Sequence, residues 1–448
     1  MRQGISVGKI VLAVFSLLLA ILIWGQGLQE SFSRPSVVPK LSLRQQEIAF
    51  LASPAVPSSL KPLLVGSSPQ EKLKKAFLEI PIEKITERDR LVLAALEPAE
   101  KRSSLLNIPF DDDALASIQN DLLASSEKVR SSSVNDLKKI KKDPLLYQVA
   151  CFALNGNREA CIDFKTAKLM AFRLIFSQGV PAVAVLFGIG LLIRQIWLLL
   201  RNQSKPWPLT VSIPLSLIDM VLLVAGGFVV LGEVFLPAFV SPISETLTKE
   251  ISSPLRESLR VLIGYTTMTV PPLVILRQQL SGLKDFDLPD GGWLQWRLRP
   301  IAPAFVKAAT GWVMVMPLVL LTSWLMNSFV GDQGGSNPLL ELVLSSKESF
   351  PLILLLLTTV VFAPLFEELV FRGTLLPVLV LKLGRSWGVI VSALVFALAH
   401  LSVGEFPPLV VLGLGLAFLR LSSGRLFPCV LMHSLWNGVT FVNLLLLA

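Results

Sequence analysis

Six polar residues near the C-terminal end of the chain lie in apolar surroundings and have types suited to acid–base chemistry. They are Glu367, Glu368, Arg372, His400, His433 and Asn437. A charge at bilayer depth costs about 2.5–3.5 kcal/mol on the insertion scale, so such residues are rare in apolar helices unless they pair or function. The two histidines are also the only ones in the sequence.

The spacing of the first three residues separates their roles. Glu368 and Arg372 are four positions apart, so on a helix they share a face and are predicted to form an ion pair, with the acid in the favourable N-terminal position. Glu367 is turned from Glu368 by about 100° and has no such partner. A carboxylate in a site of low dielectric is a candidate general base or acid. The alternative is a helix that ends here, with its charges in the headgroup region.

The histidines favour a site over a helix end. His433 and Asn437 are four positions apart and share a helix face. One histidine in a membrane is usually a partner in an interhelical hydrogen bond. Two histidines, two glutamates, an arginine and an asparagine on three apolar segments that could converge are harder to explain by packing.

The three segments together resemble a known family. The patterns Glu367-Glu368-x-x-x-Arg372, Phe396-x-x-x-His400 and His433-x-x-x-Asn437 are similar to the three ordered motifs of the CPBP intramembrane proteases. That family includes the type II CAAX prenyl endopeptidases and bacterial Abi and bacteriocin-processing relatives. The resemblance covers residues 352–448 and, more loosely, the apolar block before them, but not residues 1–168.

The resemblance implies an intramembrane endopeptidase. In that interpretation Glu367 activates the attacking water with help from His400, while His433 and Asn437 donate hydrogen bonds to the developing oxyanion. Glu368, Arg372 and Phe396 hold the shape of the site. No cofactor is implied, and the expected partners are the lipid bilayer and a membrane-associated peptide or protein substrate, for which a prenylated C-terminus is one candidate.

Three alternatives remain open from the residues. Glu367, His400 and His433 could form a His₂Glu zinc site with an open water position, although no HExxH helix arranges them. A non-catalytic membrane scaffold or chaperone could retain the same fold. A proton-coupled carrier also uses intramembrane Glu, Arg and His residues, but the sequence shows no inverted repeat.

Composition sets the surroundings of these residues. The chain has 448 residues, of which 52% are hydrophobic and 16% charged, against about 25% charged in ordinary soluble domains. This excludes a plain cytosolic enzyme and a disordered regulator. The net charge of +9 is predicted to set membrane orientation and not to bind nucleic acid.

Apolar stretches of about 20 residues predict membrane helices. The first, Ile10 to Trp24, is predicted to be a retained anchor, with a cleaved signal peptide as the alternative. Eight more are expected at 174–200, 211–238, 257–277, 303–329, 350–371, 387–402, 407–421 and 427–447. The predicted fold is therefore an all-α polytopic helix bundle, with an eight-helix core and an N-terminal anchor. Its predicted domains are 1–29 (anchor), 30–168 (soluble) and 169–448 (protease).

Basic residues in alternate loops predict the orientation. They are Arg2 and Lys9, then Arg194, Arg201 and Lys205, then Arg277, Lys284, Arg297 and Arg299, then Lys382 and Arg385, and finally Arg420 and Arg425. By the positive-inside rule these positions are cytoplasmic. The N-terminus is then cytoplasmic and residues 30–168 are extracytoplasmic, in a multi-pass protein of the cell (inner) membrane.

Residues 30–168 are rich in charge and have helical patterning, which predicts a small α-helical soluble domain. It could gate substrates or bind a partner, or be a solvated extension. Cys151 and Cys161 lie in it, in a compartment that permits a disulfide bond. The pair could equally be two free thiols.

One feature of the predicted topology conflicts with the mechanism. If the helix at 350–371 ends near Phe371, Glu367 lies toward its cytoplasmic end, whereas His400 lies at the opposite end of the next helix. A first helix that continues to Leu383 would bring Glu367 closer to His400.

Overall fold

The computed structural model describes residues 6–34, 36–80, 85–124, 130–155, 158–203, 206–331, 338–346 and 348–448, with the backbone alone at 130–134, 338 and 345. Within these ranges every regular element is a helix. The chain forms two compact units: a membrane unit of residues 1–36 and 183–445, and a second unit of residues 37–182 and 446–448. The predicted domain boundaries were 29/30 and 168/169.

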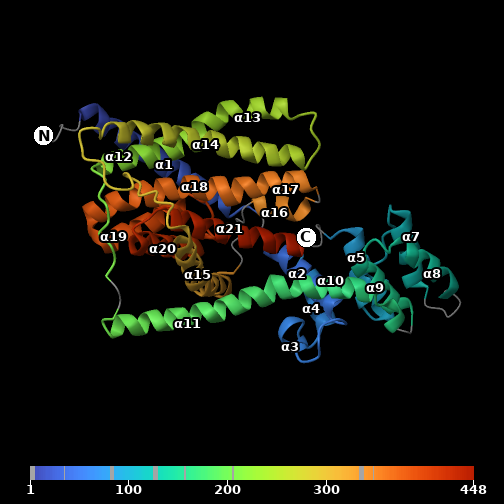
Figure 1. The fold of residues 1–448 in the computed structure, drawn as a ribbon. Helices are drawn as coiled ribbons and strands as arrows, with labels where there is room; N and C mark the ends of the chain where they lie inside the picture. The colour runs from blue at the N-terminus through green and yellow to red at the C-terminus, as the bar shows by residue number, and fades with distance from the viewer. Residues whose placement is uncertain are drawn as a thin grey trace. The chain divides into compact units, whose positions relative to one another are not determined.

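The membrane unit is a bundle of long apolar helices (Figure 1). It contains α1 (Val7–Ser31), α11 (Val180–Leu200), α12 (Leu217–Val221), η5 (Leu222–Phe235), α13 (Leu236–Leu247), α14 (Leu255–Ser281), α15 (Ile301–Phe329), α16 (Pro338–Ser345), α17 (Ser349–Leu356), η6 (Leu357–Phe362), α18 (Ala363–Glu368), η7 (Leu369–Leu375), α19 (Leu376–Leu398), α20 (Phe406–Ser423) and α21 (Phe427–Leu447). The segments η5, η6 and η7 are π-helical and continue directly into their α-helical neighbours.

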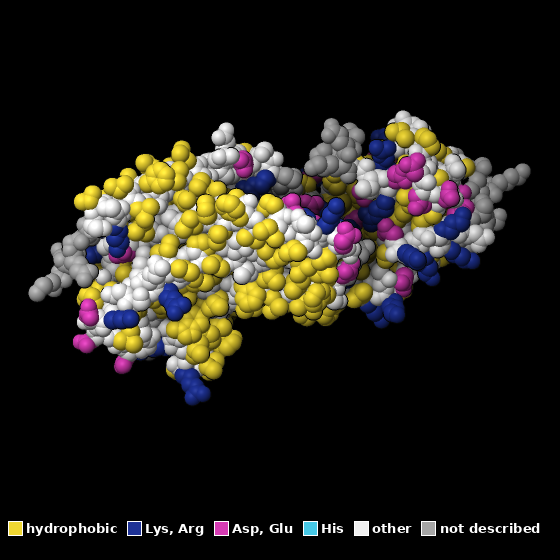
Figure 2. All heavy atoms as spheres, turned by 90° about the horizontal axis from the view of Figure 1, so that it is seen from above, with side chains coloured by type: hydrophobic (Ala, Val, Ile, Leu, Met, Phe, Trp, Pro, Cys, Tyr) yellow, Lys and Arg dark blue, Asp and Glu magenta, His cyan; other side chains and the backbone are white. Residues whose placement is uncertain are grey.

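Eight helical stretches in the described residues are long and apolar enough to span a membrane: Val7–Ser31, Phe164–Leu200, Leu217–Leu247, Leu255–Ser281, Ile301–Phe329, Ser349–Leu398, Phe406–Ser423 and Phe427–Leu447. Their outer faces are apolar, as the hydrophobic side chains in Figure 2 show. Leu186 and Phe187, for example, are 70% and 64% exposed. Such surfaces are stable against lipid tails and not against water, so the chain is a multi-pass membrane protein.

The predicted helices at 350–371 and 387–402 are two arms of one stretch, Ser349–Leu398. A single non-helical residue, Gly384, separates the arms, and its φ of 82° favours glycine because a side chain is strained there. The chain reverses at this point, since a Cβ on Gly388 would lie 2.7 Å from the backbone nitrogen of Val380. The prediction that the first helix ends near residue 371 is therefore wrong: it continues to Leu383.

Helix α1 packs along the α12–η5 helix. Lys9 forms an ion pair with Asp219 near one end, a Cβ on Gly226 would lie 3.2 Å from Ser16 Oγ, and Trp24 Nε1 donates to Glu233 Oε2 at 3.1 Å. These contacts extend along most of α1. The predicted anchor is therefore an integral part of the bundle and not a separate tether.

One of the predicted loop charges is buried inside the bundle. Arg420 lies in α20 with a side chain that is 1% exposed, and its Nε donates to the carbonyl oxygen of Arg372. The reason is that α20 continues to Ser423, one residue before the left-handed Gly424 that ends it. Arg2 and Lys205 lie outside the described residues.

The second unit contains short helices: α2 (Val38–Ala52), α3 (Lys61–Leu64), α4 (Pro69–Leu78), α5 (Glu87–Leu96), α6 (Ala99–Arg102), α7 (Asp113–Leu123), α8 (Arg130–Lys139), α9 (Pro144–Leu154), η3 (Glu159–Cys161), α10 (Phe164–Leu174) and η4 (Ile175–Gly179). Its apolar residues form a core of its own, with Leu73, Phe77 and Leu91 fully buried. The predicted pair Cys151 and Cys161 is joined by a disulfide bond.

Arg88 on α5 organises the polar contacts of this core. Its guanidinium donates to Glu47 Oε1 at 2.6 Å and to Asp143 Oδ2 at 2.7 Å. Glu47 is 5% exposed, and Asp143 also caps α9 by accepting from the Leu146 backbone nitrogen. One arginine thus links α2, α5 and α9.

Candidate active site

The two adjacent glutamates lie in an irregular part of a long helix. Glu367 and Glu368 end the short α18, which has the π-helical segments η6 before it and η7 after it. The widened turns of a π-segment change the direction of side chains relative to a regular α-helix, and such segments are frequent at functional sites. Glu367 also lies near the middle of the first arm, 349–383, so it is remote from both ends of that arm.

The hairpin at Gly384 brings His400 to Glu367. The two arms run antiparallel, so Val380 faces Gly388 and the rings of Phe371 and Phe396 lie 5.5 Å apart. The same register places His400 Nε2 3.9 Å from Glu367 Oε2. Helix α19 ends at Leu398, so His400 lies in the turn that follows it. The conflict in the predicted topology is removed, because the first arm extends far enough past Glu367.

A buried polar network lies behind Glu367. Glu368 Oε1 accepts from Arg372 Nη1 at 3.0 Å and lies 3.0 Å from His433 Nδ1. The predicted ion pair between Glu368 and Arg372 is present, and both side chains are 0% exposed. Arg372 Nη2 also donates to the carbonyl oxygen of Gly413 on α20, and its guanidinium lies 4.1 Å from the centre of the Phe396 ring. These contacts join α18, α19, α20 and α21.

The hydrogen bonds determine which histidine nitrogens face Glu367. His400 Nδ1 lies 2.9 Å from the carbonyl oxygen of Phe396, which can only accept, so Nδ1 carries the proton. His433 Nδ1 donates likewise to the carboxylate of Glu368, which also accepts from Arg372 Nη1. When each ring carries this one proton, its lone pair is on Nε2, and these two atoms lie 3.9 and 4.0 Å from Glu367 Oε2.

Three acceptor atoms therefore converge: Glu367 Oε2, His400 Nε2 and His433 Nε2. Glu367 Oε2 is buried, and no described group donates to it. The side chain of Glu367 is 15% exposed, that of His400 26% and that of His433 3%. The site is open on the His400 side and closed on the His433 side.

Tyr265 on α14 is a neighbour of the site that the sequence did not indicate. Its hydroxyl lies 3.4 Å from Glu367 Oε1 and 3.4 Å from the carbonyl oxygen of Ala363, and its ring packs edge-on against Phe366. The tyrosine belongs to a helix far from the three motifs in sequence. The sequence offers one signal for Tyr265, namely that the chain has only two tyrosines.

Asn437 is held by the first arm of the hairpin. Its Nδ2 donates to the carbonyl oxygen of Thr359 at 2.8 Å, within the π-helical η6. An amide nitrogen has two N–H groups. One is used by Thr359, and the other is available to a ligand.

The zinc alternative can be compared with these distances. In a tetrahedral site with ligand bonds near 2.0 Å, two donor atoms are about 3.3 Å apart, whereas Glu367 Oε2 is 3.9 and 4.0 Å from the two Nε2 atoms. No group of three His, Cys, Asp or Glu side chains in the described part of the chain has the geometry of a metal site. The donor set does not fit zinc as it stands.

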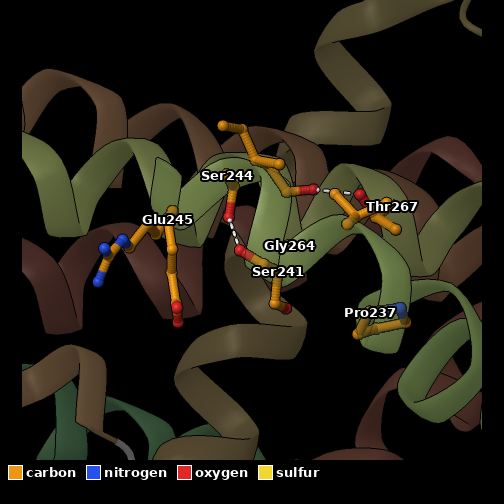
Figure 3. A pocket seen from close by; sticks show the side chains of 9 residues that line it. Pro237, Ser241, Ser244, Glu245, Gly264 and Thr267 are labelled. Carbon is orange, nitrogen blue, oxygen red and sulfur yellow. Dashed lines mark hydrogen bonds between the residues drawn. The ribbon is translucent and has the colours of Figure 1, made fainter. Parts of the chain in front are cut away.

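A separate pocket of ≈ 110 Å³ lies between α13 and α14 (Figure 3). Ser241, Ser244 and Thr267 line it with Glu245 and Arg260. Ser244 Oγ donates to the Ser241 carbonyl and Thr267 Oγ1 to the Ile263 carbonyl, so both hydroxyl protons are used within their own helices. The pocket contains no residue of the three motifs and is not the centre described above.

The fold and the site define a polytopic helical membrane protein with a partly buried Glu–His–His centre. Residues 349–439, which carry all three motifs, match the family model Type II CAAX prenyl endopeptidase Rce1-like. This match supports the CAAX protease family, a family of peptidases, for this part of the chain, as the motifs indicated.

The other comparisons are less informative. Residues 38–172 match a family model described as Domain of unknown function (DUF8675), and this range corresponds closely to the second unit. No curated protein and no solved structure matches the chain.

Proposed function

We propose that the protein is an intramembrane endopeptidase in which Glu367 and His400 activate water for attack on a peptide bond. The observation that carries this proposal is the convergence of the unpartnered Glu367 Oε2 with the Nε2 atoms of His400 and His433. Three atoms that carry lone pairs favour a hydrogen-bond donor between them. A water molecule is such a donor, and it has two O–H groups. The family match supports the peptidase class, and the roles of the individual residues are our inference.

The distances suit a bridging water. Two acceptors 3.9 Å apart can both accept from one water whose oxygen is about 2.8 Å from each. With one hydrogen on Glu367 and the other on His400, the lone pairs of that water point away from both. Attack transfers one water proton to Glu367, which is the general-base role that a carboxylate in hydrogen-bond reach can perform.

The oxyanion that forms needs donors. The second N–H of Asn437 is one. His433 is the other. Its Nδ1 proton already bonds to Glu368, so Nε2 donates only after it takes up a proton. That proton is the one that water gives to Glu367 Oε2, 4.0 Å away, and it leaves with the amine nitrogen when the C–N bond breaks; until then the ring is an imidazolium. Glu368 is then the counter-ion of the imidazolium, and Arg372 keeps Glu368 in position. In a site that excludes water, such preorganised donors are worth more than in solution.

The expected substrate is a membrane-associated peptide or protein. His400 is the most exposed catalytic side chain, so the scissile bond is expected to reach the centre from the His400 side. A prenylated C-terminus is one candidate substrate. We place the N-terminus in the cytoplasm and residues 30–168 outside it, in a cell (inner) membrane, on the strength of the basic loops.

Comparative proteomics of membranes tests the proposal. Cells that lack the protein are complemented with wild type, Glu367→Gln or the matched control Glu250→Gln, which changes an exposed carboxylate of the same unit. Precursors should accumulate in the Glu367→Gln cells alone, at equal amounts of inserted protein. Normal processing by Glu367→Gln contradicts the proposal.

The same variants separate the alternatives. If a strain carrying both Glu367→Gln and His400→Ala behaves as wild type in every function of the gene, the protein is a scaffold. A zinc enzyme would lose activity on dialysis against a chelator and regain it with Zn²⁺. The glutamate mechanism predicts activity that the chelator does not change.

A further inference from the structure

We propose that the end of α1 and the residues just after it are a positioning element of the catalytic centre. Ser31, Arg34 and Gly27 hold the loop 399–405 and thereby aim His400 at Glu367. This inference rests on the proposed function, and it assigns a role in that function to a segment outside the family match at 349–439.

The loop that carries His400 departs from the helical hydrogen-bond pattern. After Leu398 the helix ends, and the last helical hydrogen bonds are those of His400 N to the Ala397 carbonyl and Leu401 N to the Leu398 carbonyl. Leu401 has a φ of 49°, in the left-handed region that a branched side chain avoids. A conformation of this kind persists when surrounding contacts impose it.

Those contacts come from the N-terminal segment. The backbone nitrogen of Val403 donates to Ser31 Oγ at 3.0 Å, and Ser31 is 0% exposed. Arg34 Nη2 donates to the carbonyl oxygen of Leu401. The side chain of Leu401 lies against Gly27, where a Cβ would be 2.9 Å from Leu401 Cδ1.

The three contacts act on two residues of the same loop, Leu401 and Val403. Two hydrogen bonds fix the backbone on the C-terminal side of His400, and Gly27 leaves room for the Leu401 side chain. The bond from His400 Nδ1 to the Phe396 carbonyl then fixes the ring itself. Because the backbone and the ring are both held, His400 Nε2 points toward Glu367 Oε2.

The position of this clamp (Ser31, Arg34 and Gly27) explains why α1 is bound so extensively to η5. The contacts at Lys9, Ser16 and Trp24 fix the height of α1 in the bundle. Ser31 can meet Val403 only at one such height, since a shift by one turn of a helix moves a residue by about 5.4 Å.

Chemical modification of histidine tests the clamp without a substrate. Diethyl pyrocarbonate acylates the free nitrogen of imidazole, and the chain has two histidines, so mass spectrometry of the full-length protein in detergent reports each separately. Ser31→Ala and Arg34→Gln should raise the acylation rate of His400 about fivefold, the factor that one hydrogen bond is worth. His433, which is 3% exposed, is the internal standard and should not change.

Two matched variants sharpen the result. Ser31→Thr keeps the hydroxyl and should restore the wild-type rate. Leu22→Ala removes a side chain that α1 exposes to the outside, 68% exposed, and should have no effect. A His400 rate in Ser31→Ala and Arg34→Gln equal to that of wild type overturns the proposal.

If Ser31→Ala destabilises the whole unit, His433 also becomes reactive, and the acylation rates no longer test the clamp. A cross-link is then the deciding measurement. The double variant Gly27→Cys/Leu401→Cys should form a disulfide on oxidation and keep the wild-type reactivity of His400. Failure to cross-link contradicts the contact.

Activity gives the link to function. With a precursor peptide identified through Glu367→Gln, the clamp variants should lower kcat about fivefold and leave KM nearly unchanged, because His400 acts on water and not on substrate binding. If Glu367→Gln is inactive while Ser31→Ala and Arg34→Gln are fully active, the clamp is wrong and the catalytic assignment stands. If Glu367→Gln is active, the catalytic assignment itself fails, whatever the clamp variants do.

Discussion

The two units of the molecule distribute apolar and charged residues in opposite ways. In the second unit Leu73, Phe77 and Leu91 are fully buried, and charged side chains cover much of the surface (Figure 2). In the membrane unit many leucine and phenylalanine side chains also face outward, while Glu368 and Arg372 are 0% exposed and Arg420 is 1% exposed. The solvent of each unit explains the difference, because lipid tails accept apolar surface and reject charge.

The arginine networks of the two units differ in what they hold in position. Arg88 in the second unit and Arg372 in the membrane unit both bind two neighbours through charge-assisted hydrogen bonds. Arg88 connects helices around the core of the second unit. Arg372 holds a glutamate that in turn orients His433, so its network ends on an atom that faces the candidate catalytic centre.

The largest expected effect is a loss of catalysis in the membrane unit without a loss of stability. Glu367→Gln should reduce cleavage about 10²- to 10⁴-fold, the usual contribution of a general base. Its melting temperature in detergent should stay close to that of wild type, since Oε2 has no partner among the described residues to lose. Kinetics on a purified precursor and thermal unfolding measure both. A coupled loss of fold and activity would show that Glu367 is structural.

The next effect concerns stability. Arg372→Met should destabilise the membrane unit by about 3–5 kcal/mol, because it leaves the fully buried Glu368 without its cation. The ion pair of the exposed Lys139 with the partly buried Asp136 in the second unit is the matched comparison, and Lys139→Met should cost much less because water already screens that pair. Unfolding by denaturant in mild detergent measures each. Equal losses of unfolding free energy in the two variants would contradict this contrast between the units.

The disulfide is the corresponding test of the second unit. Changing both Cys151 and Cys161 to alanine should cost about 2–4 kcal/mol, because the unfolded chain regains the freedom of a closed loop. Hydrogen exchange should show the loss in α9 and its neighbours and not in α18 to α21. Cys429→Ala, at the buried free thiol of the membrane unit, should leave exchange in the second unit as in wild type.

A smaller effect is expected at the edge of the catalytic centre. Tyr265→Phe removes one hydrogen bond to Glu367 Oε1, worth about 1 kcal/mol or about fivefold in rate. The loss should appear in kcat. Tyr147→Phe, which changes the other tyrosine of the chain, should have the rate of wild type. A Tyr265→Phe enzyme at full rate would remove Tyr265 from the mechanism.

The smallest effect is a pH dependence confined to the second unit. Burial raises the pKa of Asp143, but the hydrogen bond and charge of Arg88 outweigh it and lower the pKa below its usual value of 3.8. A lowered pKa in the folded state means stability that is present above pH 3.8 and is lost as the pH falls through the folded value. Between about pH 5 and about pH 2, wild type should lose protection from exchange in α9, and Asp143→Asn should lose less. Identical profiles would contradict the role of Arg88.

Much of the site could be predicted from the sequence, because its polar residues interrupt segments that are otherwise apolar. Glu367, His400 and His433 stand out in apolar segments, and the spacing of Glu368 and Arg372 encodes their contact directly. The turn at Gly384 was harder to place, since the apolar run continues through it and one glycine between Lys382 and Arg385 was the sole mark. Tyr265, Ser31 and Arg34 carry no such mark, because their partners are more than 90 residues away along the chain.

The sequence by itself determined the all-helical membrane fold, the ion pair of Glu368 with Arg372 and the candidates for the chemistry. These follow from hydrophobicity and from spacing within one helix, both of which are properties of neighbouring residues. The tertiary structure alone decided that Glu367 meets His400, which histidine nitrogens face it, and that α1 holds the His400 loop. Those contacts depend on where a helix reverses and how helices pack, and each such choice is made by many distant residues together.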